Sequence, residues 1–185
     1  AYYELSYTLT DNKPNMDKTA LYAYQVFHEY IYYAQGWDMM FGWATIDKTE
    51  AAAKMLQSDA YEYYALNAAE YVGDYIFAVD AGHNFLYMQP GVWNRNEICN
   101  IGYNVIDMAW DEETETMYLL ATDAAARVYA LCTIDLLTGE LEIVKDYHSD
   151  LLMPWSMTFV DGTLYCCKKA SAGFYTVDFE NDCTL

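Results

Sequence analysis

Short runs of apolar and aromatic residues alternate with polar residues along much of the chain, with the period of two that is typical of β-strands. The clearest set covers residues 105–144, where acidic or glycine-bearing turns separate one run from the next. Within this set we expect a unit of four strands, at residues 105–110, 117–121, 128–135 and 141–144.

The stretch at residues 20–56 repeats at an offset of 88 positions (133 − 45 = 88). Thr-Ile-Asp occurs at residues 45–47 and again at residues 133–135, and Tyr30 matches Tyr118. Half of this offset is about 44 residues, the length of one four-stranded propeller blade, so further copies should lie between these two and after the second. The sequence therefore predicts an all-β fold, a β-propeller of four-stranded blades with about four blade repeats in this chain.

Both further copies are present. Residues 71–80 followed by 84–88 supply the middle copy, and residues 156–178 supply the last, with Asp161-Gly162 as a tight hairpin turn that requires positive φ. The predicted blades cover approximately residues 19–56, 60–101, 105–146 and 155–185.

Residues 1–10 alternate cleanly between apolar and polar positions, which predicts an additional outer strand. The last copy stops before its own outermost strand, so residues 1–10 could complete it in a ring of four blades. Alternatively they belong to a preceding blade of a larger ring with six to eight blades. We favour the second arrangement, in which the chain is part of a longer protein.

Two stretches have helical propensity instead. Residues 48–57 are rich in alanine, methionine and leucine, and a second stretch covers residues 59–70. The first aligns without a gap on a turn and fourth strand, and tertiary context routinely overrides propensity, so we expect a strand there. Any helix should be confined to residues 48–70.

An aspartate ends the third predicted strand in the last two copies, at Asp135 and Asp178, and Thr138-Gly139-Glu140 then turns into the next strand. This pattern resembles the β-propeller repeats of large bacterial secreted and cell-surface proteins, which often occur with bacterial Ig-like repeats. The resemblance covers nearly the whole chain, although the second copy carries Gln89-Pro90-Gly91 at this place. It implies an extracellular or cell-surface location.

The composition of the chain disfavours some classes of partner. The chain of 185 residues carries 28 acidic and nine basic residues, a net charge of −19, which disfavours nucleic acid and anionic membranes. No apolar run approaches the roughly 20 residues of a membrane helix, so we expect no membrane insertion. The five cysteines form no CxxC pair and are expected mostly as buried thiols.

Recognisable catalytic motifs are absent from the sequence: it contains no GxSxG, GxGxxG, GxxxxGK[ST] or HExxH. We therefore expect no cofactor. Calcium at residues 111–115 is the alternative, since carboxylates are its usual ligands, but a solvated hairpin turn explains the same residues. Asp38, Asp80 and Asp123 fall near equivalent turns, where aspartate commonly stabilises the turn itself.

Propellers usually bind ligands at one end of the ring, where the turns between second and third strands meet the links between blades. We call this end the rim. Trp37 lies in such a turn, and its counterpart at the repeat offset is Ala125, so the blade does not require a large aromatic there. The candidate ligand-binding residues on the rim are Trp37, Asp38, His83, Arg127, Tyr147, His148 and Trp155. The strand aromatics are expected to pack between blades, namely Trp43, Trp110, Tyr118, Tyr165 and Tyr175.

These observations favour an extracellular recognition or adhesion module that binds a protein or glycan on the rim and adjoins further blades or domains of a longer protein. A carbohydrate-active enzyme, a glycosidase or lyase using an acid pair such as Asp38 and Asp123, is one alternative. A structural spacer is another. We favour a binding module over an enzyme.

Overall fold

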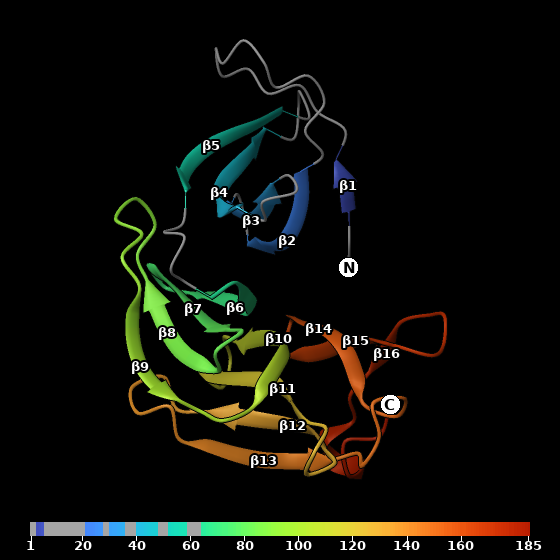
Figure 1. Ribbon diagram of the computed structural model, residues 1–185. Coiled ribbons are helices and arrows are strands. Elements are labelled where there is room, and N and C mark those ends of the chain that lie inside the picture. Colours follow the sequence, from blue (N-terminus) through green and yellow to red (C-terminus); the bar gives the residue numbers. More distant parts are fainter. Residues whose placement is uncertain (1–2, 6–20, 28–29, 36–39, 48–51, 59–63) are drawn as a thin grey trace. The chain divides into compact units, whose positions relative to one another are not determined.

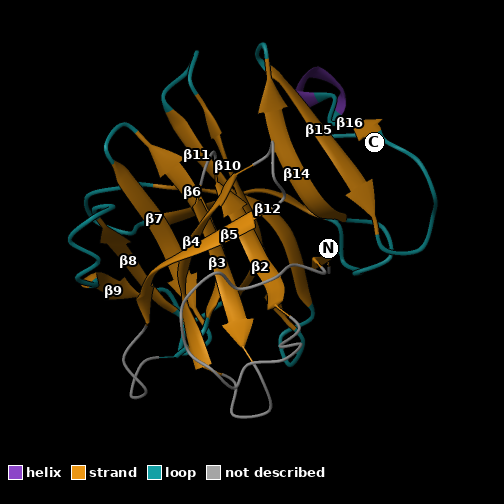
Figure 2. Cartoon of the chain, turned by 90° about the horizontal axis from the view of Figure 1, so that it is seen from above, coloured by secondary structure: helices purple, strands orange, loops and turns teal. Residues whose placement is uncertain are grey.

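The computed structural model divides the chain into two compact units, residues 1–65 and 66–185, which are considered separately. It describes residues 3–5, 21–27, 30–35, 40–47, 52–58 and 64–185. Strands make up nearly all of the regular structure in these residues, as Figure 2 shows, with one turn of 3₁₀ helix close to the C-terminus. The predicted all-β fold class is therefore confirmed for the described chain.

The first unit contains one antiparallel sheet in which strands that are consecutive in sequence are neighbours. Tyr32 and Trp43 are buried in it, with ring centroids 5.1 Å apart. The strand expected in place of a helix at residues 48–57 is confirmed over residues 52–57. The sheet consists of β1 (Tyr3–Leu5), β2 (Leu21–Phe27), β3 (Tyr30–Gln35), β4 (Met40–Asp47) and β5 (Ala52–Ser58).

The second unit contains three antiparallel sheets whose first strands lie side by side, with β10 between β6 and β14 (Figure 1). One sheet has β6 (Leu66–Val72), β7 (Tyr75–Asp80), β8 (Asn84–Met88) and β9 (Asn96–Asn100). The next has β10 (Asn104–Asp111), β11 (Thr116–Asp123), β12 (Val128–Ile134) and β13 (Leu141–Asp146). The last has β14 (Pro154–Val160), β15 (Thr163–Lys168) and β16 (Tyr175–Thr176), followed by the 3₁₀ turn η1 (Phe179–Asn181).

The strand register repeats from sheet to sheet. In the three sheets with four or more strands, a bulge interrupts the pairing of the third and fourth strands of the repeat, at Trp43/Ala44, Phe85/Leu86 and Leu131/Cys132. One position beyond each bulge, the third strand pairs with an aromatic residue on the second strand. These pairs are Tyr30↔Thr45, Phe77↔Tyr87 and Tyr118↔Thr133, and the last sheet has the corresponding pair Tyr165↔Thr176.

The offset of 88 holds in this register from the second strand onward, but it is wrong for the first strand. Phe27 pairs with Tyr30, whereas the residue that pairs with Tyr118 is Ala109, so β2 and β10 differ by 82 positions (109 − 27 = 82). The physical reason is the longer turn between β10 and β11, which adds residues between these two strands.

Two further expectations need correction. The middle copy, expected at residues 71–80 and 84–88, begins earlier, and residues 71–80 are divided between β6 and β7, because Gly73 adopts φ +60° and Gly73-Asp74 turns β6 back into β7. The helical propensity of residues 59–70 does not prevent β6 from beginning at Leu66, since Leu66, Ala68 and Ala69 are buried in it. Burial of a strand face outweighs the small differences in intrinsic propensity.

The N-terminal strand also differs from its expected place. Tyr3–Leu5 pairs with β2, at the edge of the sheet opposite β5, rather than as an outermost strand beyond a fourth strand. An alternating strand covers any open edge that offers free backbone groups, and β2 provides one. The other residues of the segment 1–10 lie outside the described chain.

Apolar clusters fill the spaces between neighbouring sheets of the second unit. Tyr118 on β11 contacts Phe159 on β14, with ring centroids 5.3 Å apart, and Phe179, at 5.4 Å. It packs between sheets as expected. Tyr165 does not, because Leu164 and Cys166 face the core and the intervening side chain points the other way, leaving it 40% exposed. All five cysteines are free, and three of them are buried, Cys132, Cys166 and Cys183.

Candidate functional site

In the second unit, the turns β7–β8, β11–β12 and β15–β16 and the links β9–β10 and β13–β14 all lie at the rim end of their sheets, because the strands are antiparallel and consecutive. His83, Arg127, Tyr147 and His148 belong to these segments, and Trp155 is the second residue of β14, directly after the β13–β14 link. Trp37 and Asp38 lie outside the described residues.

The rim of the β6–β9 sheet is organised by Asp80, which is buried at the end of β7. One carboxylate oxygen accepts the backbone N–H groups of Gly82 (2.8 Å) and Asn84 (3.0 Å). The other accepts the side-chain amide of Asn84 (3.1 Å). These bonds close a turn in which His83 adopts φ +67°. The carboxylate is thus occupied by the turn, which agrees with the turn-forming role weighed for this aspartate.

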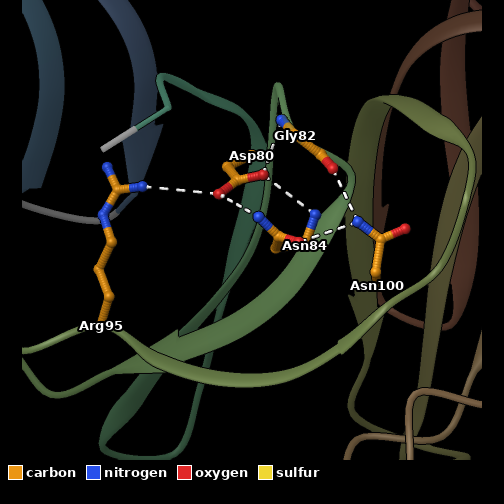
Figure 3. A network of polar contacts seen from close by, with 5 residues as sticks. All are labelled: Asp80, Gly82, Asn84, Arg95 and Asn100. Carbon is orange, nitrogen blue, oxygen red and sulfur yellow. Dashed lines mark hydrogen bonds and ion pairs between the residues drawn. The ribbon is translucent and has the colours of Figure 1, made fainter. Parts of the chain in front are cut away.

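Two residues that sequence reasoning missed brace the same turn, as Figure 3 shows. Asn100 donates its amide to the carbonyl of Gly82 (2.8 Å) and to the side-chain oxygen of Asn84 (2.9 Å). Arg95 places Nη1 3.9 Å from the Asp80 carboxylate, and both side chains are about 5% exposed. The turn that carries the predicted site residue His83 is therefore held by contacts from Asp80 and Asn100.

On the β10–β13 sheet, Arg127 and His148 are exposed. Asp123 accepts the N–H groups of Ala125 (2.9 Å) and Ala126 (3.0 Å), which shapes the turn that presents Arg127. Asp146 accepts the backbone N–H of His148 (2.8 Å), and its other oxygen lies 3.0 Å from His148 Nδ1. Both predicted residues are thus presented to solvent from turns fixed by an aspartate.

Tyr147, the neighbour of His148, has a different environment. It is half-buried, and its hydroxyl donates a hydrogen bond of 2.9 Å to the carbonyl of Cys183. Burial raises the pKa of Tyr147 above its usual range, and the nearby Cys183 adds to this effect. The side chain therefore ties β13 to the C-terminal segment.

The last sheet brings aromatic and charged groups together at its rim. Lys169 places Nζ 4.5 Å from the centroid of the Trp155 ring and 2.7 Å from a carboxylate oxygen of Asp150. Lys168 lies 4.7 Å from the ring centroid of Tyr175. We call these five residues the Trp155 cluster. Trp155 was predicted from the sequence, whereas the two lysines were not, although Lys168 ends β15 and Lys169 begins the β15–β16 turn at the rim.

The Trp155 cluster has the components of a recognition site. Aromatic faces stack on the apolar faces of sugars and on the side chains of protein partners, while Lys169 and Asp150 supply a donor and an acceptor beside the ring. His83, Arg127 and His148 lie on turns of the two neighbouring sheets, whereas the Tyr147 side chain bonds to the C-terminal segment.

A second group of titratable residues lies away from the rim, on the first strands of two sheets. Asp107 on β10 accepts the N–H groups of Met157 on β14 (2.8 Å) and of Met108 (3.0 Å), so it links two sheets. Glu70 on β6 accepts the N–H of Tyr71 (2.7 Å). The sequence signal for this pair is a carboxyl residue within a largely apolar first strand, which sequence reasoning missed.

Burial changes the chemistry of both carboxyl groups. It raises the pKa of Glu70 from 4.5 to about 7, and the negative charge of Asp107 adds to this increase. Burial also raises the pKa of Asp107 from 3.8 to about 6, against the opposing effect of its two backbone hydrogen bonds. A carboxyl group with a pKa near neutrality can donate or accept a proton at physiological pH.

Comparison with known proteins identifies the fold. No family model matches the chain, and no curated protein matches its sequence. Among solved structures, a Bacteroides thetaiotaomicron protein of unknown function matches 83% of this chain with a TM-score of 0.62 and 12% identity. The chain spans 43% of that protein.

Two functionally described proteins also match. Myxococcus xanthus glutaminyl cyclase aligns with 84% of this chain (72% of its own) at a TM-score of 0.58 and 10% identity. A structure of the nidogen/laminin complex aligns with 83% (73% of its own) at 0.55 and 10% identity.

A putative exported protein of Bacteroides fragilis and an oligogalacturonate lyase in complex with manganese each give a TM-score of 0.53 at 11% identity. They align with 97% and 96% of this chain, which spans 52% and 56% of them. No helix among the described residues is long and apolar enough to cross a membrane. At these identities the matches report the fold alone, and that fold is all-β and of the propeller type.

Proposed function

We propose that this chain is an extracellular recognition module that binds a protein or glycan ligand on the rim of a propeller. The observation that carries the proposal is the Trp155 cluster, in which a half-buried tryptophan, a lysine 4.5 Å above its ring and an aspartate meet at the rim end of the last sheet. Recognition in this form requires no cofactor.

The four sheets are, in this proposal, successive blades of one ring or of a larger ring to which neighbouring segments of a longer protein contribute. Their common register supports this arrangement, since the second- and third-strand pair recurs in all four. The match to a putative exported protein supports an extracellular location.

A glycan array, read together with binding to a panel of extracellular matrix proteins, tests the proposal. Trp155→Ala should abolish the signal of any ligand bound by the wild type. Tyr165→Ala is the matched control, because it removes an exposed aromatic from a strand away from the rim. A Trp155→Ala variant that unfolds at the same temperature as the wild type and binds the ligand equally well would contradict a rim site at this cluster.

A carbohydrate-active enzyme is the second candidate, and the carboxyl pair Glu70 and Asp107 favours it. Their raised pKa values suit proton transfer, and propeller-type neighbours include a lyase and a cyclase. Incubation with polysaccharides, followed by assay of reducing ends and of absorbance from unsaturated products, tests this candidate. Activity that disappears in Glu70→Gln and Asp107→Asn would support the enzyme, whereas binding without turnover supports the recognition module.

A further inference from the structure

A hollow of about 640 Å³ lies at the end of the β10–β13 sheet opposite the rim. Trp110 at the end of β10 and Met117 at the start of β11 line it together with the turn that joins β12 to β13. Trp110 is half-buried and packs against the apolar cluster between the β6–β9 sheet and the β10–β13 sheet. Leu137, at the tip of the turn, is 88% exposed. The hollow therefore combines a firm aromatic wall with an uncovered apolar side chain.

The charged residues around this hollow are all acidic. Its lining includes four exposed acidic residues, Glu115, Asp135, Glu140 and Glu142. No lysine, arginine or histidine is among its lining residues. Asp135 is occupied by its own turn, since it accepts the N–H groups of Leu137 (2.9 Å) and Thr138 (2.7 Å). The three glutamates make no ion pair within the described part of the chain.

We propose that this hollow binds a basic segment of a partner polypeptide, in which arginine or lysine residues alternate with apolar residues. The volume is within the range of ligand pockets, about 300 to 1,000 Å³. Cationic side chains complement the three glutamates, and a guanidinium group can also pack on the face of Trp110. The apolar residues of such a segment would cover Leu137.

Two observations disfavour other occupants. No three acidic, histidine or cysteine residues of the described chain are grouped so that they could hold a metal ion, so the carboxylates suit charges spread along a segment rather than one cation. A second copy of this chain, with its net charge of −19, would be repelled. The site is separate from the rim, so it stands or falls independently of the function proposed above.

A fluorescein-labelled peptide of alternating arginine and leucine, measured by fluorescence anisotropy with the full chain, tests the proposal. We expect saturable binding that weakens as salt increases, and weaker binding of an arginine–glycine peptide that lacks the apolar residues. The double variant Glu140→Gln/Glu142→Gln should bind about fivefold more weakly, because it removes two exposed charge contacts. Leu137→Ser should also reduce affinity.

The matched control is Glu112→Gln/Glu180→Gln, which changes the net charge equally but alters exposed residues outside the hollow. Its affinity should remain within about twofold of the wild type. Equal weakening by the two double variants would show that the acidic chain attracts the peptide non-specifically, and would overturn the proposal. Absence of saturable binding at low salt would also overturn it.

Discussion

The contact between the β6–β9 sheet and the β10–β13 sheet should be especially sensitive to substitution of Gly139. This residue lies in the β12–β13 turn, where its N–H donates to the carbonyl of Asp135 (2.8 Å), and it adopts φ +73°. A β-carbon added here would lie 2.2 Å from Sγ of Cys99 on β9 and 3.4 Å from a ring carbon of Phe85. The first distance is far shorter than any van der Waals contact, so either the Cys99 side chain or one of the two sheets would have to move.

Gly139→Ala therefore carries two penalties. The left-handed backbone costs an alanine about 1 to 2 kcal/mol, partly offset by the reduced entropy of the unfolded chain. Overpacking against Cys99 adds about 1 to 3 kcal/mol. Gly102→Ala is the matched control, because Gly102 has φ +74° and no atom within 4 Å of the added carbon, so it should show only the backbone penalty.

Chemical denaturation of both variants measures the difference, and Cys99→Ala completes a double-mutant cycle. Removing the sulfur leaves the Phe85 ring carbon at 3.4 Å and Cβ of residue 99 at 3.7 Å, both ordinary contacts, so Gly139→Ala in that background should cost no more than Gly102→Ala. The reasoning would be refuted if Gly139→Ala and Gly102→Ala were equally destabilising, or if Cys99→Ala brought no relief.

Three other substitutions test particular contacts. Tyr118→Ala should destabilise the fold by about 3 kcal/mol in denaturant unfolding, because its ring packs against Phe159 and η1. Asp80→Ala should cost about 3 kcal/mol in the same assay, since it leaves the buried Arg95 without this carboxylate. Glu70 has a pKa of about 7 in the folded state and 4.5 otherwise, so the folded state retains a proton that the unfolded chain releases, and stability falls as pH rises through this interval. The free energy of unfolding of Glu70→Gln, measured by thermal melts, should therefore rise relative to that of the wild type by about 3 kcal/mol between pH 4.5 and 8. A difference between the two proteins that does not change with pH would contradict the raised pKa of Glu70.

The repeated part of the fold could be predicted from the sequence because it is encoded locally. Alternation of apolar and polar residues fixes which face of a strand is buried, and the matching Thr-Ile-Asp segments fix the register of β4 and β12. The same logic correctly favoured a strand for β5 over the helix that its alanines suggest. It failed at Gly73-Asp74, where a glycine with positive φ and the charged residue after it turn the chain between two largely apolar stretches.

The candidate site residues could be predicted from the sequence only where their position in the repeat was enough. Trp155 and His148 follow from their place in rim segments, whereas Lys169 becomes relevant only through its contact with the Trp155 ring. Arg95 belongs to the stretch between β8 and β9 and reaches Asp80 from there, a contact that no local pattern encodes. Contacts between side chains distant in sequence depend on the assembled sheets.

One four-stranded unit, with one register between its second and third strands, recurs along the described chain. Nuclear Overhauser contacts between backbone protons on neighbouring strands test this claim most directly. We expect such contacts for all four equivalent pairs, Tyr30–Thr45, Phe77–Tyr87, Tyr118–Thr133 and Tyr165–Thr176. Contacts displaced by one residue, or helical contacts through residues 52–72, would contradict it, because a one-residue slip moves every side chain to the opposite face of its strand.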